Sequence, residues 1–130
     1  MGGNIENFRG NETILIADDD APILNIIART VRNGGYNVIT ANDGQEAVET
    51  YQNNINEIKL VMLDIVMQRK DGIAAYHEIK QINHHAVIVF ITGSIKDIRV
   101  PDNSKIIRKP FTPIDLLSQI RSSIDEHKTI

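Results

Sequence analysis

The feature that most constrains this 130-residue chain is a set of short apolar runs that are continuous rather than alternating. Strands that are covered on both faces of a parallel sheet have this pattern, because neither face meets water. The four clearer runs are Thr13–Ala17, Leu60–Leu63, Ala86–Ile91 and the segment Lys105–Pro110. Asn37–Ala41 is a fifth, weaker candidate. The sequence therefore predicts a parallel sheet buried on both sides.

Helical periodicity separates these runs. Leu24, Ile27, Ala28 and Val31 follow the i, i+3, i+4, i+7 spacing. Pro22 stands near the start of this stretch, and Gly34-Gly35 follow it, as expected for the two ends of a helix. Further helices are predicted to begin near Asp43, Asp71 and Thr112, and Asp20 is predicted to cap the first one. Strand alternating with helix predicts an α/β fold with helices on both faces of the sheet.

Polar side chains follow the predicted strands where those strands end. They are Asp18 and Asp19, Asp64, Thr92 and Lys109. Because ligands bind at the carboxyl ends of parallel strands, we expect these groups to share one pocket. Close carboxylates repel each other by about 4 kcal/mol per pair at an intermediate dielectric, so they favour a divalent cation such as Mg²⁺. An ionised aspartate also accepts a phosphoryl group without a general base.

In this order and spacing, the residues resemble the receiver domain of two-component response regulators. The resemblance rests on Asp18-Asp19, Asp64, Asp71-Gly72, Thr92 and Lys109-Pro110-Phe111. It assigns residues 13–127 to the receiver domain and leaves residues 1–12 as a flexible N-terminal lead-in. It also implies a doubly wound, flavodoxin-like, five-stranded sheet in the order 2-1-3-4-5, with a cis peptide before Pro110.

The resemblance implies a role for each residue of the set. Asp64 would be the phosphoacceptor, Thr92 would bind a phosphoryl oxygen, and Lys109 would pair with the acceptor or its phosphate. Mg²⁺ would be the cofactor, bound by Asp18, Asp19, Asp64 and the backbone carbonyl of Val66. The donor would be a histidine kinase or a histidine phosphotransfer protein, and phosphorylation would alter binding to a downstream protein target.

Three positions depart from the usual receiver pattern. Gln68 stands where receivers usually carry proline, and Ile106 stands where they usually carry an aromatic residue. Thr92 and Lys109 are only 17 positions apart, which predicts a fourth helix that is short, irregular or missing. Because that helix contributes to the surface through which many receivers dimerise, we expect a monomer in isolation.

Composition excludes several other classes of protein. The chain has no cysteine, and its 14 basic and 17 acidic side chains give a formal net charge of −3. We find neither a basic stripe for nucleic acid nor an apolar stretch that could span a membrane, and we expect a cytoplasmic protein. The four histidines have no carboxylate or cysteine at metal-ligand spacing, so we expect no metal role for them.

Two other functions remain as alternatives at this stage. A receiver-like scaffold could bind its partner regardless of phosphorylation, which the changes at Ile106 and in the fourth-helix region favour. A small Mg²⁺ phosphatase would need a general acid two residues after Asp64, and Val66 cannot supply one. We therefore expect a phosphoacceptor that is not an enzyme, and Val66 also predicts slow loss of the phosphoryl group.

Overall fold

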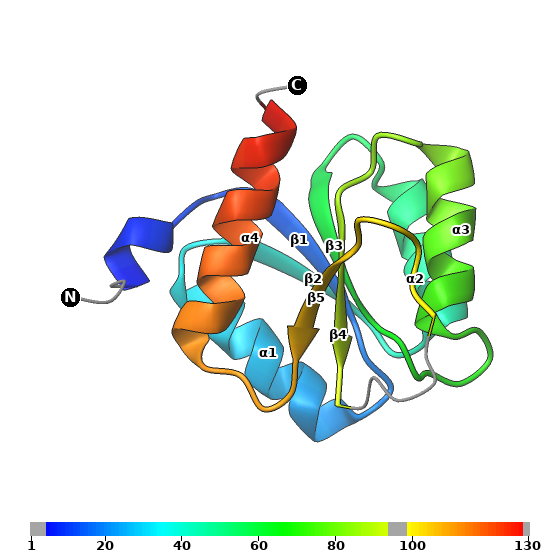
Figure 1. Ribbon diagram of the computed structural model, residues 1–130, viewed down its shortest axis with the longest axis horizontal. Helices are drawn as coiled ribbons and strands as arrows, with labels where there is room; N and C mark the ends of the chain where they lie inside the picture. Colours follow the sequence, from blue (N-terminus) through cyan, green and yellow to red (C-terminus); the bar gives the residue numbers. More distant parts are fainter. Residues whose placement is uncertain (1–4, 94–98, 129–130) are drawn as a thin grey trace.

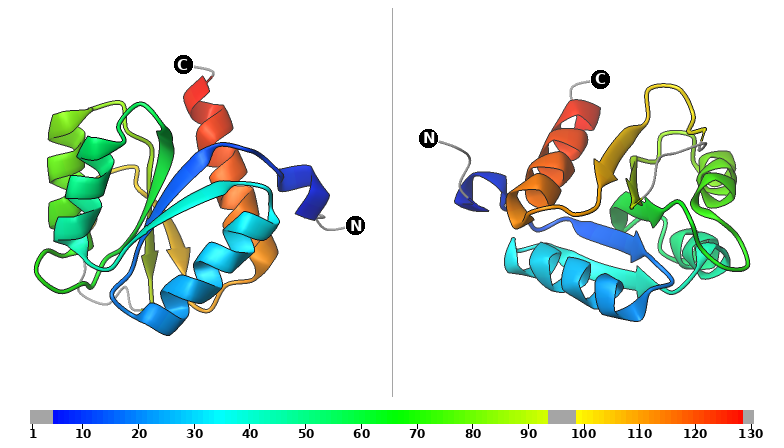
Figure 2. Two further views of the ribbon diagram at one scale, coloured as in Figure 1. Left: turned by 180° about the vertical axis from the view of Figure 1, so that it is seen from behind. Right: turned by 60° about the horizontal axis from the view of Figure 1, so that its bottom comes forward.

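In a computed structural model, residues 5–93 and 99–128 are described. They form a five-stranded parallel sheet in the order β2-β1-β3-β4-β5 between two layers of helices (Figures 1 and 2). This confirms the predicted fold class and strand order. The strands are β1 (Thr13–Ala17), β2 (Asn37–Ala41), β3 (Ile58–Asp64), β4 (Ile88–Thr92) and β5 (Lys105–Arg108); the helices are η1 (Ile5–Phe8, 3-10), α1 (Ala21–Asn33), α2 (Gly44–Asn53), α3 (Gly72–Ile82) and α4 (Pro113–Lys128).

Each face of the sheet carries its own apolar core. Helices α1 and α4 cover one face, and α2 and α3 cover the other (Figure 1). Side chains alternate between the faces along each strand, so Ile14 and Ile16 pack toward α1 and α4, whereas Leu15 and Ala17 pack toward α2 and α3. Both sets are fully buried, which explains why the run in the sequence is apolar without interruption.

The helices begin at the residues that the sequence predicts. The carboxylates of Asp20, Asp43 and Asp71 accept hydrogen bonds from backbone amides in the first turns of α1, α2 and α3. At α4, the Asp115 amide donates to the Thr112 hydroxyl, and the Thr112 amide donates to the Asp115 carboxylate. This reciprocal pair is a capping box, and it fixes where α4 leaves the loop after β5.

The sheet register brings the strand ends to one edge. Ala17 pairs with both Ala41 and Leu63, and Thr92 pairs with Arg108. The chain leaves β1, β3, β4 and β5 at the bottom of Figure 1. The peptide between Lys109 and Pro110 is cis, as predicted.

The connection between β4 and β5 is shorter than a usual strand–helix–strand crossover. Residues 94–98 lie outside the described part of the chain. Gly93 and residues 99–104, the described remainder of the connection, are not helical. For these residues the prediction of a short, irregular or missing fourth helix is confirmed. Asn103 adopts a left-handed backbone with φ of 64°, and the segment turns back into β5.

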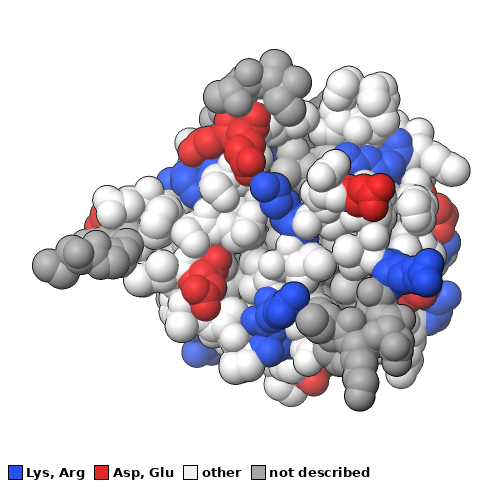
Figure 3. Space-filling view, viewed as in Figure 1, with Lys and Arg blue, Asp and Glu red and all other residues white. Residues whose placement is uncertain are grey.

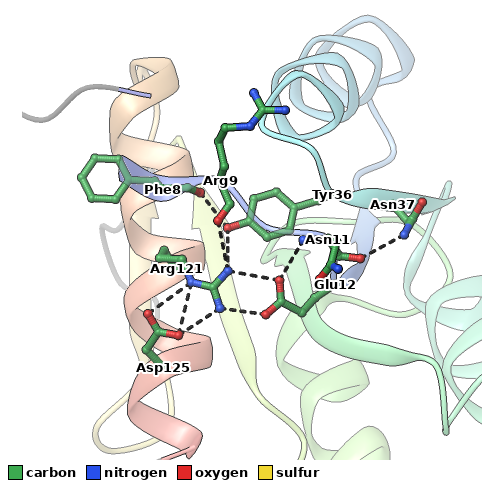
Figure 4. A network of polar contacts seen from close by, with 8 residues as sticks. All are labelled: Phe8, Arg9, Asn11, Glu12, Tyr36, Asn37, Arg121 and Asp125. Carbon is green, nitrogen blue, oxygen red and sulfur yellow. Dashed lines mark hydrogen bonds and ion pairs between the residues drawn. The ribbon is translucent and has the colours of Figure 1, made fainter. Parts of the chain in front are cut away.

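The segment before β1 is bound to α4 by polar contacts at the amino ends of the strands (Figure 4). The Arg121 guanidinium donates to the Glu12 carboxylate at 2.7 Å, to Asp125, and to the backbone carbonyl of Arg9. The Tyr36 hydroxyl donates to the carbonyl of Phe8 at 2.7 Å. Residues 5–12 are therefore attached to the domain through side chains of α4 and of the loop before β2.

The surface carries charges of both signs. On the face shown in Figure 3, acidic and basic side chains alternate in small groups among uncharged residues. Of the helices in the described ranges, none has the length and apolar character needed to cross a membrane.

Candidate functional site

Three carboxylates meet at the carboxyl edge of the central strands. Asp18 and Asp19 follow β1, and Asp64 is the last residue of β3, the neighbouring strand. One oxygen from each side chain lies within 4.8 Å of the others. Asp18 is 1 % exposed and Asp64 is 7 % exposed, whereas Asp19 lies at the surface. Two of the three negative charges are therefore largely removed from water.

Lys109 reaches this cluster from the end of β5. Its ammonium lies 3.1 Å from Asp18 Oδ2 and 3.3 Å from Asp64 Oδ2. The resemblance implied a contact with the acceptor, and the structure adds the contact with Asp18. A single lysine thus divides its charge between two carboxylates, which leaves the cluster with an excess of negative charge.

That excess changes the acid–base properties of Asp64. Burial and the nearby Asp18 carboxylate together raise the pKa of Asp64 to about 6, because Lys109 lowers it by less than they raise it. Burial alone would lower the pKa of Lys109, but the Asp64 and Asp18 carboxylates outweigh burial, so this pKa is raised. Lys109 is therefore a permanent cation at neutral pH, and Asp64 is the group whose ionisation costs free energy.

These properties fit a hard divalent cation. The three side chains offer carboxylate oxygens, which are the ligands that Mg²⁺ prefers, and the exposed Asp19 leaves room for retained water. Mg²⁺ would supply the positive charge that Lys109 alone does not provide. Among the described residues, these aspartates are the only group of three His, Cys, Asp or Glu side chains close enough to hold a metal ion.

Thr92 lies at the same edge, at the end of β4. Its residue is 1 % exposed, and its carbonyl accepts a hydrogen bond from the Lys109 amide at 2.8 Å. Sheet pairing therefore holds Thr92 and Lys109 next to each other. Val66 is 65 % exposed, and its amide donates to Asp64 Oδ1 at 3.3 Å. A metal-binding role for the Val66 carbonyl stays a prediction.

An apolar cleft of about 460 Å³ opens beside Lys109. Its walls come from α1 and from the loop after β5, and Ile26 in one wall is 59 % exposed. A Cβ atom at Gly93 would lie 3.8 Å from the Lys109 side chain, which is an ordinary contact. Small side chains are therefore compatible with position 93, and the openness of the pocket does not depend on glycine alone. The lining residues are Ile23, Ile26, Gly93, Lys109, Pro110 and Phe111.

Gly72 determines how closely α3 approaches the acidic site. A Cβ atom there would meet the Asp64 carbonyl oxygen and would lie 2.8 Å from Ile65 Cα. The Gly72 amide also donates to the Ile65 carbonyl at 2.8 Å. The sequence indicated a turn and a helix start at Asp71-Gly72; the structure shows that this glycine also permits the backbone after β3 to fold back against α3.

Two residues beside the site, Gln68 and Arg69, make contacts that the sequence did not predict. The Gln68 amide donates to Asp19 Oδ2 at 3.1 Å, and the Arg69 guanidinium binds both oxygens of Asp43. Arg69 has φ of 63°, the left-handed region that non-glycine residues rarely adopt. Because this turn depends on the path of the loop after β3, the apolar pattern could not predict it.

Three histidines lie together far from the aspartates. His84, His85 and His127 line a cavity of about 400 Å³ at the amino ends of the strands, together with Lys80 and Lys105. The rings of His84 and His85 are 4.0 Å apart, and those of His85 and His127 are 6.4 Å apart. The group of side chains that could hold a metal ion in the described part of the chain consists of Asp18, Asp19 and Asp64 and includes none of these rings.

Comparisons with known proteins agree with this arrangement. The response regulator receiver domain family matches residues 14–121. The chain is 34 % identical over 124 residues to response regulator RR06 of Streptococcus pneumoniae, covering 90 % of this chain and 55 % of RR06. It is 30 % identical over 116 residues to the receiver protein CpdR of Brucella abortus, covering 85 % of this chain and 95 % of CpdR. The chain thus spans about half the length of RR06 and nearly all of CpdR.

A solved structure shares the fold. The CheX–CheY–BeF₃–Mg²⁺ complex of Borrelia burgdorferi matches with a TM-score of 0.80 and 31 % identity, covering 85 % of this chain and 87 % of the matched chain. The family match covers most of the sheet and its helices, together with Asp18, Asp19 and Asp64. The chain therefore belongs to the family of response regulator receiver domains of two-component systems.

Proposed function

We propose that Asp64 accepts a phosphoryl group from the phosphohistidine of a histidine kinase or a histidine phosphotransfer protein. An Asp64 oxygen forms a bond to phosphorus, the bond from phosphorus to the histidine nitrogen breaks, and its electron pair stays on the imidazole. The observation that carries this proposal is the position of Asp64, buried at the end of β3, 3.3 Å from Lys109 and within 4.8 Å of Asp18 and Asp19.

Mg²⁺, when bound, would neutralise charge on the carboxylates and on the incoming phosphoryl group. Asp18, Asp19, Asp64 and the Val66 carbonyl would hold it. Lys109 would move from the ionised acceptor to a phosphoryl oxygen, and the Thr92 hydroxyl would bind another. Such positioning and electrostatics account for most of the catalysis of phosphoryl transfer, because the protein has little covalent chemistry to perform.

The donor would approach through the apolar cleft beside Lys109. Exposed Ile26, together with Phe111, offers apolar area beside Lys109, which contacts Asp64, and this suits a protein donor better than a free metabolite. The phosphorylated state would then favour an arrangement of Thr92 and Lys109 that changes affinity for a downstream target. We propose that this phosphorylation-dependent change in affinity for a target is the function of the chain, and that the chain is not an enzyme. We also propose that it acts in the cytoplasm.

Incubation with acetyl phosphate and Mg²⁺ tests the proposal. We expect the intact mass to rise by one phosphoryl group, with the modification located at Asp64 by peptide mapping after conversion of the acyl phosphate with hydroxylamine. Asp64→Asn should abolish the gain. Asp20→Asn is the matched control, because Asp20 caps α1 and asparagine caps as well. Modification of a residue other than Asp64 would refute the assignment.

A phosphorylation-independent scaffold is the second candidate. Ile106 is half-buried and packs against the core beneath α2 and α3, and residues 99–104 are not helical. Ile106 lies in β5 and residues 99–104 lie in the connection before it, so both features differ from the usual receiver pattern at this edge of the sheet. If this candidate is correct, a target will bind the phosphorylated chain and the Asp64→Asn variant with equal affinity.

A further inference from the structure

The loop after β3 makes a contact with the acidic site that the roles proposed above do not use. The backbone amide of Gln68 donates to Asp19 Oδ2 at 3.1 Å, across a sequence separation of 49 residues. Asp19 is the exposed carboxylate of the cluster, whereas Asp18 is buried and accepts hydrogen bonds from the Asp20 amide at 2.9 Å and from Lys109. Orientation of Asp19 therefore depends on the loop.

Contacts on both sides of Gln68 fix the position of its amide. Met67 is 8 % exposed and belongs to the core beneath α2 and α3. Arg69 binds Asp43 with two hydrogen bonds, Nε to Oδ2 at 2.7 Å and Nη2 to Oδ1 at 3.1 Å. Asp43 is itself held, because it caps α2 by accepting from the Glu46 amide at 2.8 Å.

The next residue adds a third attachment. The Lys70 amide donates to the Gln68 carbonyl at 2.6 Å, and the Lys70 ammonium forms an ion pair with Glu78 of α3. The turn 67–70 is thus bound to the core, to the start of α2 and to α3. The backbone at position 69, where Arg69 makes its paired contact with Asp43, is left-handed, with φ of 63°.

We propose that Gln68 and Arg69 are positioning residues for Mg²⁺: the Gln68 amide orients the Asp19 carboxylate, and the Arg69–Asp43 pair holds that amide in place. A hydrogen bond to Oδ2 restricts rotation of the carboxylate and leaves Oδ1 for the ion. Groups that orient a metal ligand in this way commonly change metal affinity 10- to 100-fold when they are removed. This inference rests on the proposed Mg²⁺ site, and it concerns how this chain builds that site.

Position 68 makes the idea testable. Proline has no N–H, so Gln68→Pro removes the donor, whereas Gln68→Ala keeps the donor and removes only the exposed side chain. Arg69→Ala removes the two bonds to Asp43 and leaves the amide at position 68 intact. Arg69 is an exposed residue, so its replacement tests the same idea in a protein that retains its core.

The experiment is calorimetric titration of MgCl₂ into the full chain and its variants, with far-UV circular dichroism to confirm the fold of each. We expect Gln68→Ala to bind Mg²⁺ within about twofold of the unmodified chain, Gln68→Pro to bind roughly tenfold more weakly, and Arg69→Ala to be weakened several-fold. Equal affinity of the Gln68→Pro and Gln68→Ala variants would overturn the inference. If Gln68→Pro does not fold, an Arg69→Ala affinity equal to that of the unmodified chain would overturn it instead.

Asp19→Asn separates this inference from the proposed function. Weak binding by Asp19→Asn, together with unchanged binding by Gln68→Pro and Arg69→Ala, would leave the Mg²⁺ site in place and refute the positioning role. Binding by Asp19→Asn as tight as that of the unmodified chain would show that Mg²⁺ does not use Asp19. That result would overturn the proposed ligand set and the inference together.

Discussion

Replacement of Asp64 by asparagine should stabilise the metal-free protein at neutral pH. Burial, and then the charge of Asp18, raise the pKa of Asp64 from 3.8 to about 6. Between these two pH values the folded chain holds a proton at Asp64 that the unfolded chain has already lost. Stability therefore falls as the pH rises through this range, and at pH 7 the ionised Asp64 carboxylate destabilises the fold.

The size of the effect follows from the same values. A rise from 3.8 to about 6 corresponds to roughly 3 kcal/mol, at about 1.4 kcal/mol for each pKa unit. Water at the open edge of the pocket screens part of this interaction. We therefore expect Asp64→Asn to raise the free energy of unfolding at pH 7 by about 1 to 3 kcal/mol.

Urea unfolding, followed by far-UV circular dichroism in the presence of EDTA, measures the difference. The two proteins should differ at pH 7 and should agree to within about 0.5 kcal/mol near pH 4, where Asp64 carries a proton in the folded state. Asp20→Asn serves as the control for loss of a carboxylate outside the pocket. If Asp64→Asn is less stable than the unmodified chain at pH 7, the pairing with Lys109 outweighs burial and the reasoning is wrong.

Three further predictions concern Gly72, Arg121 and Val66. Gly72→Ala should lower the free energy of unfolding by about 1 to 3 kcal/mol in urea titrations, because the new methyl group meets the backbone at Asp64; an unchanged midpoint would contradict this. Arg121→Ala should cost about 1 to 3 kcal/mol at pH 7, because it removes the partner that lowers the pKa of Glu12 from 4.5 to about 2. This cost should shrink as the pH falls from 4.5 toward 2, since Glu12 then takes up a proton in both proteins. Val66 offers no group to orient water, so phosphorylated protein should lose its phosphoryl group slowly in Mg²⁺ at neutral pH, and a half-life of seconds by mass spectrometry would contradict this.

Much of the fold was predictable because local patterns and tertiary packing agree. Residues 14–17 are all buried, two toward each layer of helices, so the apolar run and the two-sided burial describe the same fact. The caps at Asp20, Asp43 and Asp71 were predictable because side chains that bind the first turn of their own helix act over three residues.

Strand boundaries were less accurate. β3 begins at Ile58 rather than Leu60, because exposed Lys59 interrupts the apolar run at a bulge, where Thr13 pairs with Ile58 and Ile14 with Leu60. β4 begins at Ile88 rather than Ala86, because the Ala86 amide bonds to Asn83 and its carbonyl accepts from Lys80. At β4 the Lys80 side chain binds the Ala86 carbonyl, and a hydropathy pattern cannot show such a contact.

Part of the candidate site was predictable from the sequence, and part was not. The convergence of Asp18, Asp19, Asp64, Thr92 and Lys109 follows from parallel strands that end at one edge, so spacing along the sequence was sufficient to predict it. The contact from Gln68 to Asp19 requires a particular loop path, which Arg69 sets through a side-chain contact 26 residues away. Contacts of this kind depend on tertiary structure, and no local pattern encodes them.

The attachment of residues 5–12 to α4 has a practical consequence for anyone who trims this protein. A shortened version that starts at residue 13 loses the carbonyls of Phe8 and Arg9 and the carboxylate of Glu12, all of which accept from Tyr36 or Arg121. The side chains of Tyr36 and Arg121, which these residues now shield, would then face water at the end of the molecule remote from the aspartates. Probes or tags are therefore better attached before residues 5–12 than substituted for them.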